Sequence, residues 1–216
     1  MLKIIKQTKN PKYLVITPLK NGDKISKITK KSINRNRHQF DWISYQSNNN
    51  IPTNTELALK EYKYIRYIIK IDNDINANRN MLDKMYNVLH TMPKHIAYCY
   101  PKFKYLLPNG KSIDFTDNIF NVERLLKSNY ITSNSMIDRY KLDEIGGFVT
   151  DNKYVRLLDW ALWLKFLYYG YIGVPSNTGF VTALNDNNIS ARGNEDYKEK
   201  HKRVYDDFVL PIMNRD

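Results

Sequence analysis

The sequence predicts an α/β fold with a mostly parallel central sheet, flanking helices and a small additional β element. Three observations support this prediction: short β-branched runs alternate with helical patterns, polar loops follow the runs, and the apolar content suffices for one core. The chain has 216 residues, of which 42% are hydrophobic and 26% charged. Such a composition is ordinary for a globular protein. We find neither an internal repeat nor a linker, so we expect a single domain over residues 1–216.

The first half of the chain alternates strands with helices. Apolar runs bounded by Pro, Gly, Asn or Asp predict the strands, and apolar residues at helical spacing predict the helices. We expect strands at residues 13–17, 40–45, 67–71 and 95–100, and helices at residues 25–33, 53–62 and 79–89. In parallel sheets of this kind, ligands bind beyond the carboxyl ends of the strands.

The second half is less regular. Pro108-Asn109-Gly110 predicts a turn between two extended pieces within residues 105–115. We expect further strands at residues 131–137, 171–174 and 179–184, and helices at residues 155–169 and 196–209. Gly170 follows the first of these helices, as glycine often does at a helix C-terminus.

Charge and cysteine content limit the function only weakly. The formal net charge is +12, but the lysines and arginines are scattered, and the richness in Lys, Asn, Ile and Tyr is typical of an AT-rich genome. The single cysteine, Cys99, lies in an apolar run, which favours a buried thiol in a reducing compartment.

The sequence shows neither a signal peptide nor a membrane-spanning run, which favours a soluble protein. The basic start Met1-Leu2-Lys3 has no apolar segment of a signal peptide behind it, and no apolar run approaches the roughly 20 residues that cross a bilayer. We expect a cytoplasmic protein, in the host cytoplasm if the source is viral, that is at most peripheral to a membrane.

Asp72-Asn73-Asp74 is the motif with the clearest chemistry. It directly follows the strand expected at residues 67–71, so both carboxylates leave a fixed backbone toward a common space. Mg²⁺ and Mn²⁺ prefer oxygen ligands and commonly use one or two carboxylates plus substrate phosphates. Taken alone, the motif is explained at least as well by an ordinary turn or a helix cap as by a metal site.

Several segments in a fixed order add to this motif: residues 15–21, 31–33 with 41–43, 67–74, 131–139 with 142–148, and 158–164. Together, over about residues 13–192, they resemble the nucleotide-sugar glycosyltransferases of the GT-A (Rossmann-like) fold. The resemblance is to the large inverting family that includes many bacterial and viral polysaccharide-building enzymes. It implies a nucleotide-binding half at about residues 11–100 and an acceptor-binding half at about residues 101–216.

The resemblance implies transfer of a hexosyl or deoxyhexosyl group from a nucleoside-diphosphate sugar to a hydroxyl of a glycan or glycoprotein, with inversion and with Mn²⁺ or Mg²⁺. UDP is the commonest nucleotide for such enzymes, and no nucleic-acid partner is expected. The implied donor-site residues are Thr17, Pro18, Asn21, Tyr45, Asp72, Asn73 and Arg192, and the implied metal ligands are Asp72, Asp74 and His201, with Asp74 the more direct.

Asp159 is the candidate general base, because the resemblance places it in the segment that carries this group. A carboxylate at a helix N-terminus is also stabilised in the ionised form that a base needs. The ordinary alternatives are a first-turn carboxylate for Asp159, a surface histidine for His201 and a loop arginine for Arg192. Trp160 and Trp163 at helical spacing indicate core, and at most one would face an acceptor.

Two departures from the family pattern affect the donor pocket. The family has an aspartate after its second strand that reads the nucleotide base, whereas residues 45–50 read Tyr-Gln-Ser-Asn-Asn-Asn. The glycine- and asparagine-containing helix before the metal motif is replaced by residues 55–60, Thr-Glu-Leu-Ala-Leu-Lys. How the base is recognised is therefore open.

Three other functions remain open. A nucleic-acid-binding module is suggested by the charge and by cations alternating with aromatics at residues 63–67 and 100–105, although no known binding motif is present. A nucleotidyltransferase would need a glycine-rich, arginine-containing loop where this chain has residues 17–22, Thr-Pro-Leu-Lys-Asn-Gly. A catalytically inactive sugar-nucleotide-binding relative would share the fold.

Overall fold

The computed structural model describes residues 1–115, 118–183 and 196–215. Within them, nine strands form one sheet in the order β1-β3-β2-β4-β8-β6-β9-β5, with β7 paired to β6. The strands are β1 (Leu2–Lys6), β2 (Tyr13–Leu19), β3 (Phe40–Gln46), β4 (Tyr67–Lys70), β5 (Ile75–Ala77), β6 (Ile96–Leu106), β7 (Ser112–Phe115), β8 (Met136–Asp138) and β9 (Ile172–Ala183). Parallel pairs join β2 to β3 and β4, and β6 to β9, while the other pairs are antiparallel.

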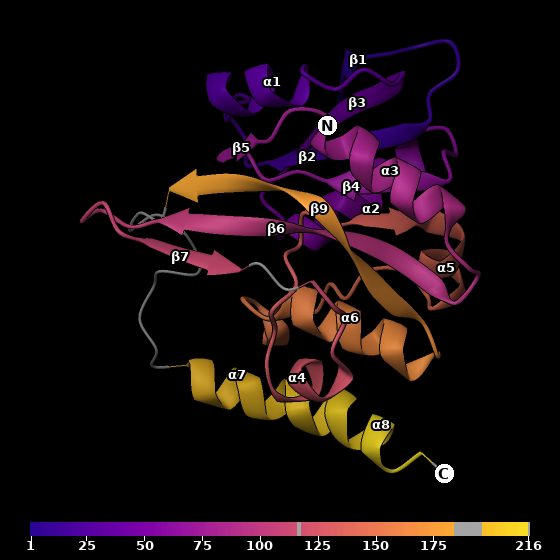
Figure 1. Cartoon of the computed structure of the whole chain (residues 1–216), viewed down its shortest axis with the longest axis vertical. Helices are drawn as coiled ribbons and strands as arrows, with labels where there is room; N and C mark the ends of the chain where they lie inside the picture. Colours follow the sequence, from indigo (N-terminus) through magenta and orange to yellow (C-terminus); the bar gives the residue numbers. More distant parts are fainter. Residues whose placement is uncertain (116–117, 184–195, 216) are drawn as a thin grey trace.

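Helices cover both faces of this sheet, which confirms the α/β fold class (Figure 1). The helices are α1 (Lys27–Ile33), α2 (Ile51–Glu61), α3 (Met81–Thr91), α4 (Val122–Lys127), α5 (Arg139–Glu144), α6 (Leu158–Tyr168), α7 (Tyr197–Val204) and α8 (Leu210–Met213). A short 3-10 helix at Asn152–Tyr154 precedes α6, and a π-helix at Tyr205–Val209 joins α7 to α8.

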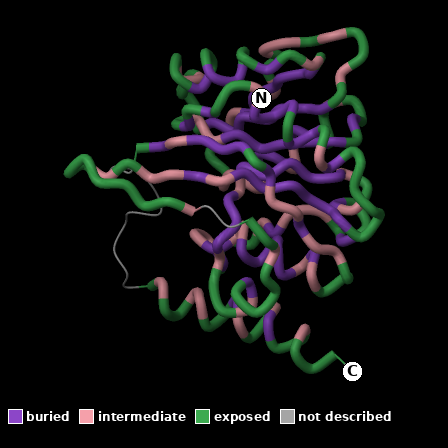
Figure 2. The backbone as a smooth tube through the Cα atoms, in the orientation of Figure 1, coloured by how far each residue is buried: buried purple, intermediate pink, exposed green. Residues whose placement is uncertain are grey.

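The core has two parts, and Figure 2 shows that the central strands are the most continuously buried segments. In one part, side chains of β2 and β6 pack with α2 and α6; in the other, the alternate side chains of the same strands pack with α3. The two faces follow from the strand period, in which successive side chains point to opposite sides of the sheet. Cys99 is fully buried, as expected.

The expected strands of the first half are confirmed to within a few residues, but two further strands were missed. β1 is an edge strand that pairs antiparallel with β3, and its partly exposed side chains give no continuous apolar run. β5 has three residues and pairs with β9 directly after the Asp72-Asn73-Asp74 turn. Both depend on a partner distant in sequence, which local periodicity does not reveal.

The second half differs more from expectation. The strand expected at residues 131–137 begins only at Met136, because the hydroxyl of Ser135 donates to the Thr132 carbonyl (2.6 Å) and closes a turn. The two strands expected at residues 171–184 form one strand, β9. The helix expected from residue 155 begins at Leu158, because Arg156 has a φ of 83° that no right-handed helix accepts.

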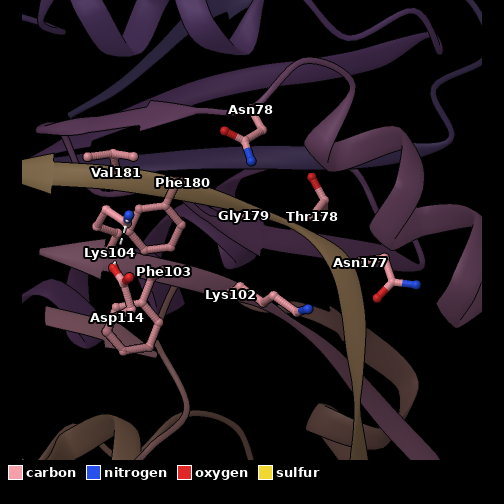
Figure 3. Close-up of a pocket in the computed structure, with 10 residues that line it drawn as sticks. All are labelled: Asn78, Lys102, Phe103, Lys104, Asp114, Asn177, Thr178, Gly179, Phe180 and Val181. Carbon is pink, nitrogen blue, oxygen red and sulfur yellow. Dashed lines mark ion pairs between the residues drawn. The ribbon is translucent and has the colours of Figure 1, made fainter. Parts of the chain in front are cut away.

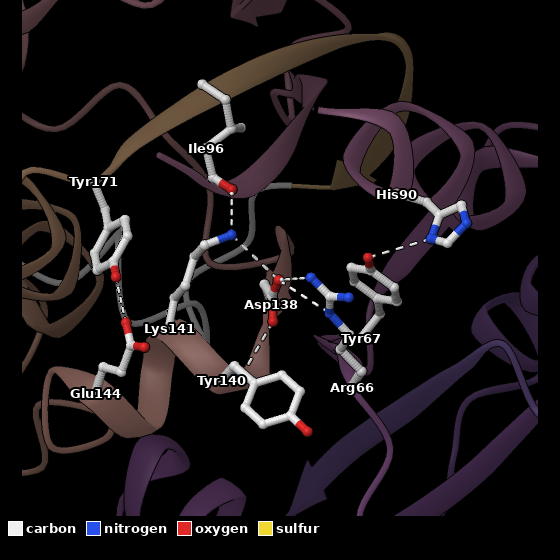
Figure 4. Close-up of polar contacts among 9 residues, drawn as sticks. All are labelled: Arg66, Tyr67, His90, Ile96, Asp138, Tyr140, Lys141, Glu144 and Tyr171. Carbon is white, nitrogen blue, oxygen red and sulfur yellow. Dashed lines mark hydrogen bonds and ion pairs between the residues drawn. The ribbon is translucent and has the colours of Figure 1, made fainter. Parts of the chain in front are cut away.

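Asp138 fixes the start of α5 against β4 and β6 (Figure 4). Its buried carboxylate accepts from Arg66 Nη2 at 2.9 Å, and Lys141 Nζ lies 3.3 Å away while donating also to the Ile96 carbonyl. A buried carboxylate requires such partners. The network therefore secures β8 between β4 and β6, and with it the residues that precede β8.

Candidate active site

The Asp72-Asn73-Asp74 turn lies where β4 leaves the sheet. The Ile71 amide still donates to the Ile16 carbonyl of β2 at 2.8 Å, so the backbone is fixed up to the residue before the first carboxylate. β5 begins immediately after the turn, at Ile75. The turn is thus held at both ends by the sheet, as the sequence predicted for its start.

Asp72 is held by side chains from two segments. Lys70 Nζ lies 2.5 Å from Oδ1, and Ser133 Oγ and Asn134 Nδ2 donate to Oδ2 at 3.2 and 2.9 Å. The Asp72 amide in turn donates to Asn134 Oδ1 at 2.8 Å. Burial alone would raise the pKa of Asp72, but the Lys70 charge and these hydrogen bonds lower it, so the carboxylate is ionised.

Asp74 is the more exposed carboxylate of the turn. Its carbonyl accepts from the Thr182 hydroxyl at 3.3 Å, which ties the turn to β9, the strand that pairs with β5. Partial burial and the neighbouring Asp72 charge raise the pKa of Asp74, while the Lys70 charge opposes them. A cation placed against Asp74 would relieve this repulsion.

Asp159 lies in the first turn of α6, where its Oδ1 accepts from the Trp160 amide at 3.0 Å. Burial raises the pKa of Asp159 to about 6, against the effects of the Lys70 charge and of that amide. The Asp72 charge adds to the increase. Burial therefore outweighs the helix N-terminus, and the carboxylate is ionised above a pH of about 6.

These electrostatic effects act between residues 70–72 and Asp159, which are far apart in the sequence. Asp159 responds to the charges of both Lys70 and Asp72, so the acceptor-side carboxylate and the donor-side turn share one electrostatic environment. The role of Asp159 as the base stays a prediction.

Asn73 connects the turn to the loop that follows β2. Its Oδ1 accepts from the Ser26 amide at 2.7 Å, and its Nδ2 donates to the Lys24 carbonyl at 2.9 Å. Ser26 also caps α1, because its hydroxyl accepts from the Thr29 amide at 3.1 Å. Asn73 therefore orders the loop and the start of α1 beside the carboxylates.

The other expected donor-site residues surround the end of β2 but are not all open to a ligand. The buried Thr17 hydroxyl accepts from Trp42 Nε1 at 3.0 Å, and Pro18 lies in β2 opposite Tyr45. The Tyr45 hydroxyl donates to Glu61 Oε1 at 2.8 Å. Asn21 is exposed in the turn after β2. Thr17 and Tyr45 thus have internal partners for the groups that a nucleotide would use.

His201 contacts other residues than the carboxylates of the turn. The His201 ring packs on Trp160, with centroids 4.6 Å apart, and its Nε2 lies 3.2 Å from the Lys127 carbonyl. Arg192 lies outside the described residues. Their roles stay predictions.

Trp160 and Trp163 are core residues, as their spacing indicated. Both are fully buried, and their indole nitrogens donate to the carbonyls of Leu125 and Ile131 at 2.7 and 3.1 Å. Neither ring is placed to stack on a sugar. They instead fix α6, and so the position of Asp159.

The donor set fits a metal only in part. Within residues 1–115, 118–183 and 196–215, no three side chains of the His, Cys, Asp and Glu types form a metal-binding group. The contacts that Asp72 receives from Lys70, Ser133 and Asn134 leave it a poor direct ligand. Asp74 fits better, since a hard cation needs only one or two carboxylates when substrate phosphates complete its shell.

Sequence reasoning missed Lys70, Ser133 and Asn134 as site residues. A signal for Lys70 was present, because a lysine interrupts the run Ile68-Ile69-Lys70-Ile71 of a buried strand. Ser133 and Asn134 belong to the segment assigned to the acceptor side, whereas the structure shows them holding Asp72.

A pocket of about 300 Å³ lies beside β6 and β9, and its lining does not include Asp72, Asp74 or Asp159 (Figure 3). Its lining includes Lys102, Asn177 and the Lys104–Asp114 ion pair. Figure 3 shows the polar ends of Asn78, Lys102 and Asn177 spread along the strand rather than turned to one point.

Of the two stretches in which cations alternate with aromatics, residues 63–66 precede β4 and residues 100–105 lie in β6. Tyr67, Tyr100 and Phe103 are each less than 9% exposed, and Arg66 is paired with Asp138. These three rings are not a stacking surface for nucleic-acid bases. Within the described part of the chain, no helix has the length and apolar character needed to cross a membrane.

Comparison with known proteins identifies the fold. No protein-family model matches the sequence, and the search of curated proteins found no match. The structure is similar to that of residues 1–349 of the glycosyltransferase TarS of S. aureus in complex with UDP-GlcNAc. The TM-score is 0.63 at 15% identity, over 95% of this chain and 67% of that one.

Two other TarS structures are also similar. For residues 1–349 in complex with UDP, the TM-score is 0.60 at 15% identity, over 95% of this chain and 66% of that one. For the longer S. aureus TarS chain the TM-score is 0.55 at 15% identity, over 95% of this chain and 40% of that one. This chain thus spans about two thirds of the TarS fragment, and it has the fold of the GT-A-like glycosyltransferases.

Proposed function

We propose that the chain is a glycosyltransferase that moves a sugar from a nucleoside-diphosphate sugar to an acceptor hydroxyl of a glycan, with inversion. One observation carries the proposal most directly: a half-buried carboxylate in the first turn of a helix, Asp159, responds to the charges of the Lys70–Asp72 pair at the end of β4. Perturbed carboxylates that meet in this way are typical of catalytic sites. The fold supports the same assignment.

The proposed reaction is a single displacement. The acceptor oxygen forms a bond to the anomeric carbon as the bond from that carbon to the diphosphate oxygen breaks, and the diphosphate leaves with the electron pair. Asp159 takes the proton of the acceptor hydroxyl. Its pKa of about 6 suits a base that acts near neutral pH.

The residues of the turn bind and orient the donor. Asn73 orders residues 24–26, and Asp74 is exposed, so that both would act on a bound diphosphate. A Mn²⁺ or Mg²⁺ ion held by Asp74 and the donor's phosphates would supply charge neutralisation for the leaving group. Lys70 and Asn134 keep Asp72 fixed.

We infer UDP as the nucleotide, because two of the similar TarS structures are complexes, one with UDP-GlcNAc and one with UDP. Thermal-shift measurements with UDP, GDP and dTDP sugars, with and without Mn²⁺, test this inference, since a ligand that binds only the native state raises its melting temperature. A shift with UDP sugars alone is expected. No shift with any nucleotide sugar would reject the proposed donor site.

Nucleic-acid binding is the alternative that the same assay must exclude. The net charge of +12 favours some attraction to oligonucleotides at low salt. If the proposal is right, oligonucleotide binding is absent at physiological salt while UDP binding persists. Oligonucleotide binding without UDP binding would favour the alternative.

A further inference from the structure

Lys70 is an unusual residue for its place in the sheet. It ends β4, is preceded by the buried Ile68 and Ile69, and its own side chain is only 9% exposed. An ammonium removed from water costs free energy unless an opposite charge compensates it. An aliphatic residue would fill the same space without this cost, so the lysine needs a reason other than packing.

The compensating charge is Asp72. Lys70 Nζ lies 2.5 Å from Oδ1, while Ser133 and Asn134 donate to Oδ2. Both oxygens of Asp72 thus have donors from within the chain. A divalent cation that bound Oδ1 would therefore have to compete with this ammonium.

The same ammonium acts on more than one carboxylate. Asp74 and Asp159 both respond to the Lys70 charge, although only Asp72 bonds to it. Without Lys70, an incoming diphosphate would meet three carboxylates and no buried cation from β4. Coulomb repulsion of this kind is strong where the surroundings exclude water.

We propose that Lys70 is a built-in cation of the donor site. Lys70 takes the place of a metal ion on Asp72 and holds that carboxylate in position. Asp74 is then the carboxylate that binds any divalent ion. Part of the diphosphate affinity is therefore independent of metal. The inference rests on the proposed function for its ligand, the nucleoside diphosphate. In this role Lys70 is a positioning residue.

Calorimetric titration with UDP, in EDTA and in Mn²⁺, tests the inference in the full chain. The parent protein should bind UDP in EDTA, and more tightly in Mn²⁺. Lys70→Met, which keeps the length and loses the charge, should weaken binding in EDTA by at least about tenfold, as expected for a lost charge-assisted contact. In Mn²⁺ the loss should be smaller, because the ion can then occupy Asp72.

A second titration, with Mn²⁺ alone, gives a readout independent of the nucleotide. Lys70→Met should bind Mn²⁺ more tightly than the parent protein, since the variant exposes Asp72 to the ion. Lys70→Arg should resemble the parent protein in both titrations. The double variant Lys70→Met/Asp72→Asn removes both charges and should recover part of the UDP binding in EDTA, which a cycle of single and double variants measures.

Lys63→Met is the matched control. Lys63 Nζ lies 2.9 Å from Oδ2 of Asp41, a fully buried carboxylate outside the site, so this variant, like Lys70→Met, removes a lysine from an aspartate. It should change neither titration.

Equal losses of UDP affinity in EDTA and Mn²⁺ for Lys70→Met, or an unchanged Mn²⁺ affinity, would overturn the inference. If the parent protein bound no UDP, the proposed function would fail, while the Mn²⁺ titration would still decide the role of Lys70.

Discussion

Asn73 Oδ1 accepts a hydrogen bond from the Ser26 amide at 2.7 Å, so the carboxylate turn and the capped start of α1 are joined. Asn73→Ala removes this bond and the one to Lys24. We expect UDP affinity to fall by about ten- to thirtyfold, because the two lost bonds together contribute roughly 2 kcal/mol at most to the order of the loop. Calorimetry measures this. Asn109→Ala, which removes a similar bond to Lys111 in the β6–β7 turn, is the control and should leave UDP affinity unchanged.

Asp74→Ala should abolish the gain in UDP affinity that Mn²⁺ produces and leave binding in EDTA nearly intact. The reason is that Asp74 is the exposed carboxylate of the turn, whereas Asp72 is engaged by Lys70. Titrations of UDP with and without Mn²⁺ separate the two effects. A variant that kept the full Mn²⁺-dependent gain would show that Asp74 is not the ligand.

Asp159→Asn should keep UDP binding but lower the transfer rate by about 10²–10⁴-fold, the usual contribution of a general base. In the parent protein, the rate should rise with pH through about 6, because the base must be deprotonated. Initial rates across pH 5–8 in a product assay measure this. Transfer by the variant at the parent rate would remove Asp159 from the mechanism.

The raised pKa of Asp159 also predicts how the stability of the protein changes with pH. The pKa of Asp159 is raised from its ordinary value of 3.8 to about 6, so the folded state binds the proton more tightly than the unfolded chain does. The protonated Asp159 contributes its full stabilisation of the folded state below pH 3.8, and this contribution is lost as pH rises through about 6. The change in the free energy of unfolding caused by Asp159→Asn should therefore be more favourable at pH 8 than at pH 4, by roughly 1–3 kcal/mol. Urea unfolding at both values measures the difference; equal effects would contradict the prediction.

Asn134→Ala should weaken UDP binding and lower stability by about 1–3 kcal/mol, because it removes a donor to Asp72 and the acceptor for the Asp72 amide. Ser133→Ala removes one longer bond and should have a smaller effect. Asn121→Ala, which deletes the cap of α4, controls for a lost amide and should reduce stability without reducing UDP affinity. If Asn134→Ala and Asn121→Ala had the same effect on UDP affinity, the role of Asn134 would be structural only.

Local sequence determined much of the frame. The β-branched runs predicted β2, β3 and β4 because these strands are buried on both faces and read as continuous apolar segments. The hairpin of β6 and β7 followed from its Pro-Asn-Gly turn. Asp72 and Asp74 were placed beyond a strand, and Asp159 in a helix, by the same local patterns.

The tertiary structure alone decided how these pieces meet. The insertion of β8 between β4 and β6 brings Ser133 and Asn134 to Asp72, and no local period encodes a contact across so much of the chain. The same packing buries Lys70 against Asp72 and raises the pKa of Asp159, against the expectation from its helix position. The sequence by itself determined which carboxylates stand at the ends of a strand and a helix. Only the fold decided their charges and partners, because burial and ion pairing depend on neighbours that the chain supplies from a distance.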